Sequence, residues 1–124
     1  MNHQRLARFV RKWFAEWRPE TTAFGHATAL LTQLIQVRPA EAWERILALI
    51  ACAPDEEAIG YVGAGPLEDF LIAHGQAFID RVEATAIADA RFAACLAIVW
   101  GSNCIDSGVY ARISRTVQSP LKAS

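Results

Sequence analysis

The stretch from Gly60 to Gly75 reads GYVGAGPLEDFLIAHG and decides how the chain divides into helices. Three glycines fall within its first six residues, and glycine tolerates positive φ angles and close backbone contacts. Pro66 suits the first turn of a helix, where its missing N–H has no partner to lose. The sequence therefore predicts a tight corner at Gly63 and Gly65, with a new helix beginning at Pro66.

The helix predicted after this corner carries two acidic residues in its first turn. From the third position, the carboxylate of Glu68 can accept a hydrogen bond from the backbone N–H of Gly65. Asp69 adds negative charge near the positive end of the helix dipole, and Gly75 closes the helix. A well-capped helix start explains these residues most simply. The alternative is a functional role for Glu68 or Asp69.

Outward from this stretch, apolar residues recur at helical spacing along most of the chain, and no strand-like alternation of useful length is present. Capping residues are expected at Thr21 or Thr22, at Asp55 and at Asp89, and Pro39 suits a first helical turn. The predicted helices span about residues 2–17, 22–38, 39–53, 56–62, 66–75, 76–88, 90–100 and 109–117. The predicted fold is all-α, with about seven or eight short helices stacked as antiparallel pairs in a HEAT-like array or an irregular bundle.

The length of 124 residues and the hydrophobic content of 53% predict a single domain with a packed core. Within it we expect an N-terminal helical pair over residues 1–38 and a core over residues 39–118. Residues 119–124 are expected to form a frayed tail.

Charge is distributed unevenly although the formal net charge is only −1. Five Arg or Lys residues stand between Met1 and Arg18, with Glu16 as the one acid, whereas ten acids stand against two arginines between Glu41 and Asp89. An acidic middle can attract a basic partner, or the basic first helix of the same or another copy of the chain. A homodimer through the first helix is one form of this hypothesis.

Three cysteines, Cys52, Cys95 and Cys104, lack the spacing of a metal site or a redox pair. They are expected to be free thiols that behave as small apolar residues, in a reducing, cytoplasmic setting. No apolar run is long enough to cross a bilayer. Because no HExxH, GxSxG or phosphate-loop motif is present, neither a metal nor another cofactor is expected.

More than half of the chain, from Trp43 to Arg112, resembles an uncharacterised, mostly bacterial domain family of unknown function. The resemblance is carried by Trp43-Glu44-Arg45-Ile46-Leu47, by Gly63-Ala64-Gly65-Pro66-Leu67-Glu68-Asp69, by Val99-Trp100 and by Arg112-Ile113. It implies a helical domain and brings no activity with it.

The family resemblance also implies that Glu68 has a role beyond that of an ordinary exposed surface residue. We expect Glu68 to be partly buried and paired with an arginine of the C-terminal half, Arg112 first and Arg91 second, because buried acids are rarely unpaired. Gly63, Gly65, Pro66, Glu68 and Arg112 then form a structural motif.

The function that these features favour is a small non-enzymatic module that binds another protein, by analogy with immunity or antitoxin proteins. Its predicted contact surface consists of Asp55, Glu56, Glu57 and Asp69, with Tyr61 as an aromatic anchor. One alternative is an enzyme that uses Glu68, Asp69 and His74, although their spacing on one helix is poor for a shared ion. The other is association with a membrane or, less favoured, nucleic acid through the basic first helix, which also carries Trp13 and Trp17.

Overall fold

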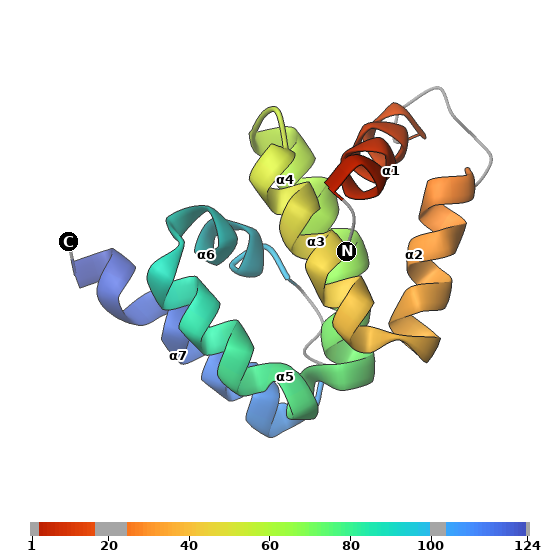
Figure 1. Cartoon of the computed structure of the whole chain (residues 1–124). Coiled ribbons are helices and arrows are strands. Elements are labelled where there is room, and N and C mark those ends of the chain that lie inside the picture. Colours follow the sequence, from red (N-terminus) through yellow and green to blue (C-terminus); the bar gives the residue numbers. More distant parts are fainter. Residues whose placement is uncertain (1–2, 17–24, 100–103, 124) are drawn as a thin grey trace.

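The computed structural model describes residues 3–16, 25–99 and 104–123, and all regular secondary structure in these ranges is helical (Figure 1). The predicted all-α class is confirmed. The elements are α1 (His3–Glu16), α2 (His26–Val37), α3 (Pro39–Cys52), α4 (Glu56–Val62), the π-helical turn η1 (Gly63–Leu67), α5 (Glu68–Ala88), α6 (Ala90–Leu96) and α7 (Ser107–Ala123). Because α4, η1 and α5 follow one another without a break, the described residues form six uninterrupted helical runs rather than seven or eight. The HEAT-like array remains a prediction.

The predicted corner at Gly63 and Gly65 is wrong. Gly63 has φ −66° and ψ −44°, which is ordinary helical geometry, and no glycine in the described part of the chain has a positive φ. Pro66 lies inside the helical run rather than at its start. A proline in a helix interior cannot donate the usual backbone hydrogen bond, and its ring crowds the preceding turn. The chain accommodates Pro66 by widening one turn into the π-helix η1.

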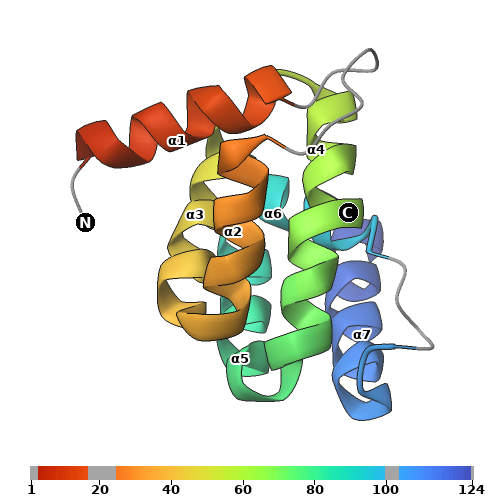
Figure 2. The ribbon, with the colours of Figure 1, turned by 90° about the vertical axis from the view of Figure 1, so that its right-hand side faces the viewer.

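The helical run changes direction at His74, near the end of the same stretch. His74 has φ −134° and ψ 15°, outside the helical region, and α5 returns from this point alongside the preceding helices (Figure 2). The imidazole Nε2 of His74 is hydrogen-bonded to the backbone carbonyl of Ile35 on α2. Gly75 is buried against α7, where a Cβ atom would lie 2.9 Å from Cγ1 of Val109. The corner therefore depends on contacts with α2 and α7.

The predicted helix starts at Asp55, Asp89 and Pro39 are confirmed. The Asp55 carboxylate accepts a hydrogen bond from the backbone N–H of Ala58 at 2.8 Å and caps α4. Asp89 caps α6 in the same way, and Pro39 occupies the first turn of α3. At the other end of the chain, α7 is helical up to Ala123, through most of the segment that was predicted to fray.

Of the residues named in the sequence analysis, Met1, Trp17, Arg18, Thr21, Thr22 and Trp100 lie outside the described residues. Among the described residues, Glu16 at the end of α1 caps α2. Its carboxylate accepts hydrogen bonds from the backbone N–H groups of Ala27 and Thr28, both at 3.0 Å, and from the Thr28 hydroxyl at 3.1 Å. Two helices are joined by this one carboxylate.

We expect Glu16→Ala to lower the free energy of unfolding by about 1–2 kcal/mol at neutral pH. Burial opposes the charge of Glu16, but the hydrogen bonds from Ala27 and Thr28 outweigh it and lower the pKa of the carboxyl. A carboxyl with a lowered folded-state pKa contributes stability above its unfolded pKa, and this contribution is lost as the pH falls through the folded value.

Urea unfolding at neutral pH and again below the unfolded pKa of Glu16 measures this contribution. The difference between wild type and Glu16→Ala should shrink in acid. Glu44→Ala removes an exposed acid from α3 and serves as the control, with little change expected. Equal stability of wild type and Glu16→Ala at neutral pH would contradict the capping role.

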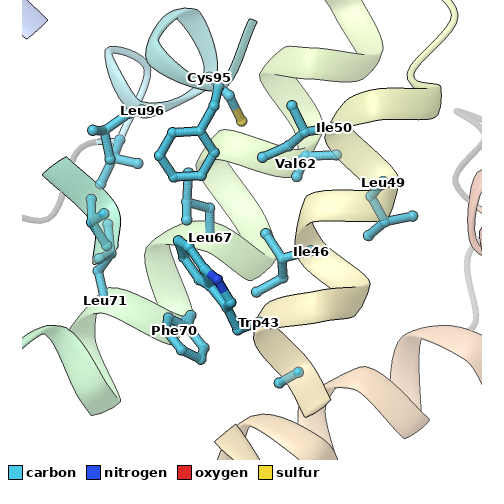
Figure 3. Packing of buried hydrophobic residues seen from close by; sticks show 14 of the residues in the cluster. Trp43, Ile46, Leu49, Ile50, Val62, Leu67, Phe70, Leu71, Cys95 and Leu96 are labelled. Carbon is cyan, nitrogen blue, oxygen red and sulfur yellow. The ribbon is translucent and has the colours of Figure 1, made fainter. Parts of the chain in front are cut away.

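The core is centred on Trp43 of α3, whose neighbours come from two later helices (Figure 3). The Trp43 ring lies 5.5 Å from the ring of Phe70, 5.9 Å from that of Phe78 and 5.6 Å from that of Phe92, measured between centroids. Buried aliphatic side chains fill the space around these rings. Trp43 therefore ties α3 to α5 and α6.

Helix α1 packs its apolar stripe against α2 and α3. Phe9 and Val10 are buried, and Trp13 is only 1% exposed. A membrane anchor would need the apolar stripe of α1 to be exposed, but this stripe is part of the core. The basic residues of the helix remain outside.

Candidate functional site

A groove runs between α2 and the junction of η1 with α5. It consists of two adjoining pockets of about 180 Å³ and 200 Å³, which share Thr32, Ile35 and Asp69. We call it the Asp69 groove. Its walls are formed by Trp13, Thr28, Leu31, Thr32, Ile35, Gln36, Gly65, Pro66, Asp69, Ile72 and Ala73.

The π-helical turn shapes one wall of this groove. Gly65 and Pro66 lie within η1 and line it, and a Cβ atom built on Gly65 would meet no atom within 4 Å. Single-turn π-helices occur frequently at functional sites, because the extra residue displaces neighbouring side chains. The motif around Pro66 thus contributes to a concave surface rather than to a corner.

Of the described residues that line the groove, Asp69 alone carries a charge. Asp69 is exposed overall, but partial burial of its carboxyl beside the groove raises the pKa of that carboxyl, and the neighbouring Glu68 raises it further. Among the described residues, no Lys, Arg or His forms an ion pair with Asp69. A carboxylate in this situation gains from an external cation or hydrogen-bond donor.

Two threonines of the groove offer acceptors in addition to Asp69. The Thr28 hydroxyl donates its hydrogen to Glu16, and the Thr32 hydroxyl donates to the backbone carbonyl of Thr28 at 3.1 Å. Each hydroxyl has one hydrogen, so both oxygens present only lone pairs to the groove. The polar part of this wall is therefore suited to a donor, and above all to a cation.

Asp69 lies on the same helical run as the other residues of the predicted contact surface, roughly 20 Å along it from Asp55 at 1.5 Å per residue. Asp55, Glu56 and Glu57 are exposed at the start of α4. Tyr61 is half-buried, packs against the core, and donates a hydrogen bond to Glu57, which raises the pKa of the tyrosine. The structure joins Tyr61 to Glu57, and Asp69 lies further along the same helical run.

The predicted pairing of Glu68 with Arg112 or Arg91 is wrong. Arg112 on α7 binds Glu83 through Nε at 2.9 Å and Nη2 at 2.5 Å, and binds Asp80 at 2.8 Å. Its hydrogen bond lowers the pKa of Glu83. Because α5 reverses at His74, α7 faces the returning half of α5, which carries Asp80 and Glu83.

Arg91 also has other partners. Its Nε donates to the backbone carbonyl of Ile50 at 2.7 Å, and its Nη2 donates to that of Ala53. Arg91 thus caps the C-terminal end of α3. The sequence offered no acceptor side chain at these positions, so only the structure reveals this role.

The catalytic alternative required Glu68, Asp69 and His74 to act together. The groove is lined by Asp69 but by neither of the other two. The His74 ring packs 5.5 Å from that of Phe70 and is held by its hydrogen bond to Ile35. Within the described ranges, no group of three His, Cys, Asp or Glu residues is placed to hold a metal ion.

The three cysteines differ in their surroundings. Cys95 is buried as expected, and burial raises its pKa to about 12, so it remains a thiol. Cys52 and Cys104 are exposed, contrary to the expectation of three small apolar core residues. All three are free. No helix in the described part of the chain has the length and apolar character needed to span a bilayer.

Comparison with known proteins gives one match. No curated protein and no solved structure matches the chain. A family model described as a family of unknown function, DUF6869, matches residues 16–120. The matched region extends beyond the resemblance from Trp43 to Arg112 and includes every residue of the Asp69 groove except Trp13. The chain therefore belongs to the family of unknown function DUF6869.

Proposed function

We propose that the chain is a non-enzymatic interaction module whose Asp69 groove receives a lysine or arginine side chain of another protein. The observation that carries the proposal is the Asp69 carboxylate, which lines a groove without an ion-pair partner among the described residues. Placing a cation there offsets the partial desolvation that raises the pKa of Asp69. The hydroxyl oxygens of Thr28 and Thr32 supply further acceptors.

The shape and apolar content of the groove also support a basic side chain. Leu31, Ile35 and Pro66 can contact an aliphatic stem, while the charged head reaches Asp69. Each of the two adjoining pockets, of about 180 Å³ and 200 Å³, has room for one side chain.

The acidic start of α4 supports a basic partner independently. Asp55, Glu56 and Glu57 are exposed on the helical run that carries Asp69. Such a charge distribution accelerates encounter with a basic protein, although each exposed charge adds little affinity. An immunity or antitoxin-like role in the cytoplasm fits a module of this kind.

Asp69→Asn is expected to abolish partner binding without lowering stability. Asp69 is exposed overall but partly desolvated, so at neutral pH its charge costs some stability, and this cost disappears as the pH falls through its raised pKa. The melting temperature of Asp69→Asn at pH 7 should therefore equal or exceed that of wild type. A clearly lower value would assign Asp69 a structural role instead.

Capture from a lysate of the source organism, followed by mass spectrometry, tests the binding itself. The wild-type chain and a Glu44→Gln control should retain one stoichiometric protein, and Asp69→Asn should lose it. A Lys- or Arg-containing segment of that protein should then bind the wild-type chain directly and lose at least about tenfold in affinity when the basic residue becomes Ala. Capture unaffected by Asp69→Asn, or no captured protein, would contradict the proposal.

A further inference from the structure

A second concave site lies on the opposite side of α2, and it is basic. This pocket of about 390 Å³ is formed by α1, α2 and α3. Its charged and titratable residues are Arg5, Arg8 and Lys12 of α1, His26 of α2, and Glu41 and Arg45 of α3. We call it the basic pocket. Four cationic side chains therefore face one carboxylate, within the volume range of sites that bind small ligands.

Arg45 is the buried member of the basic pocket. Its side chain is only 6% exposed, and its Nε has no hydrogen-bond partner. Nη2 lies 3.6 Å from the Glu41 carboxylate, and the Phe9 ring covers the guanidinium, with Cζ 4.8 Å from the ring centroid. The Nε atom itself is buried, but the Arg45 side chain lines the pocket and its ion pair with Glu41 is long, so the guanidinium retains capacity for an anionic partner.

The remaining cations of the basic pocket are fixed by the packing of α1. Phe9 and Trp13 are buried in the core, so the opposite side of the helix is held outward. Arg8 and Lys12 are exposed, stand one turn apart at the flank of this buried face, and line the pocket together with Phe9. At the N-terminus of α2, the backbone N–H groups of Ala27 and Thr28 are already used by Glu16. The side chains of Arg8, Lys12 and Arg45 are donors that line the basic pocket.

We propose that the basic pocket binds a multiply charged oxyanion of the phosphate class, either free or as the monoester of a small molecule. Arg45 supplies a donor from the floor, and Arg8 and Lys12 supply two more from the rim. Leu30 and Phe9 give the pocket an apolar edge that can contact the organic part of a monoester. The basic pocket shares no lining residue with the Asp69 groove. A negative result for one proposal therefore leaves the other unaffected.

Calorimetric titration with inorganic phosphate, pyrophosphate and phenyl phosphate, at constant ionic strength, tests the site. We expect saturable binding of one anion per chain, weakened at least about tenfold by Arg8→Gln and by Lys12→Gln, because each removes a charge-assisted hydrogen bond. Tighter binding of phenyl phosphate than of inorganic phosphate would identify a monoester as the ligand class. The reverse order would identify the free anion.

Arg11→Gln is the matched control, because Arg11 is exposed on the same helix but does not line the basic pocket. Its affinity should stay within about twofold of wild type. Arg45→Met should abolish binding, with the melting temperature recorded to show that the chain is folded. Absence of saturable binding for all three anions would overturn the proposal. So would equal weakening by Arg11→Gln and Arg8→Gln, or binding of a single-stranded oligonucleotide alone.

Discussion

One added methyl group at residue 63 is expected to lower the free energy of unfolding by about 2–3 kcal/mol or more, because overpacking at a rigid contact forces the backbone to shift. In Gly63→Ala the new Cβ would lie 2.6 Å from the backbone carbonyl oxygen of Cys95, 3.2 Å from Cβ of Ile98 and 3.4 Å from Sγ of Cys95. The nearest of these atoms belongs to the backbone and cannot rotate away. Relief requires α6 to move from α4 and η1, which it contacts directly.

Gly60→Ala is the control for this substitution. Gly60 lies in α4 on the same helical run, and a Cβ atom there would meet nothing within 4 Å. Alanine at an open helical position should raise stability by up to about 1 kcal/mol, since glycine loses more backbone entropy on folding. Urea unfolding followed by circular dichroism measures both variants. Changes of the same sign and size at the two positions would refute the close-contact role of Gly63.

Trp43→Ala is expected to cost about 3–5 kcal/mol, the range for deleting a large buried aromatic side chain. Trp43 is 6% exposed, and its ring contacts Phe70, Phe78 and Phe92. Removing it leaves a cavity between α3, α5 and α6 that these rings cannot fill without leaving their positions. For a small domain, this loss is a large fraction of the total stability.

Ile87→Ala and Trp43→Phe make this prediction specific. Ile87 of α5 is 74% exposed, so its truncation should change stability by less than about 0.5 kcal/mol. Trp43→Phe keeps a ring in the cavity and should fall between wild type and Trp43→Ala. The melting temperature by circular dichroism is the measurement, because removing Trp43 also changes the fluorescence. A Trp43→Ala variant that melts within a degree or two of wild type would exclude a central role.

Much of the fold could be predicted from the sequence, because helices are specified locally. The apolar stripe of α1 and the spacing around Trp43 predict helical faces from residues three and four positions apart. The caps at Asp55 and Asp89 and the first-turn proline at Pro39 also act within one turn of the chain. These signals need no knowledge of distant residues, and the structure confirms them.

The candidate site was predictable only in part. Asp69 was named as a contact residue, but its groove depends on α2, whose side chains are more than 30 positions away in the chain. The sequence reveals the basic charge of α1 but not the basic pocket, which also needs α2 and α3. One available signal was Arg45, a charged residue between the apolar positions Trp43 and Ile46 of the buried face of α3.

The sequence by itself therefore determined the helical class, most helix starts and the uneven charge. Only the tertiary structure decided how Gly63, Pro66 and Arg112 are used. Gly63 is needed for the approach of α6 rather than for a turn, and Pro66 widens a continuous helix because the bend lies at His74. Arg112 meets Asp80 and Glu83 because that bend directs α5 back along α7. Each outcome depends on contacts between residues distant in the chain, which local pattern and propensity do not specify.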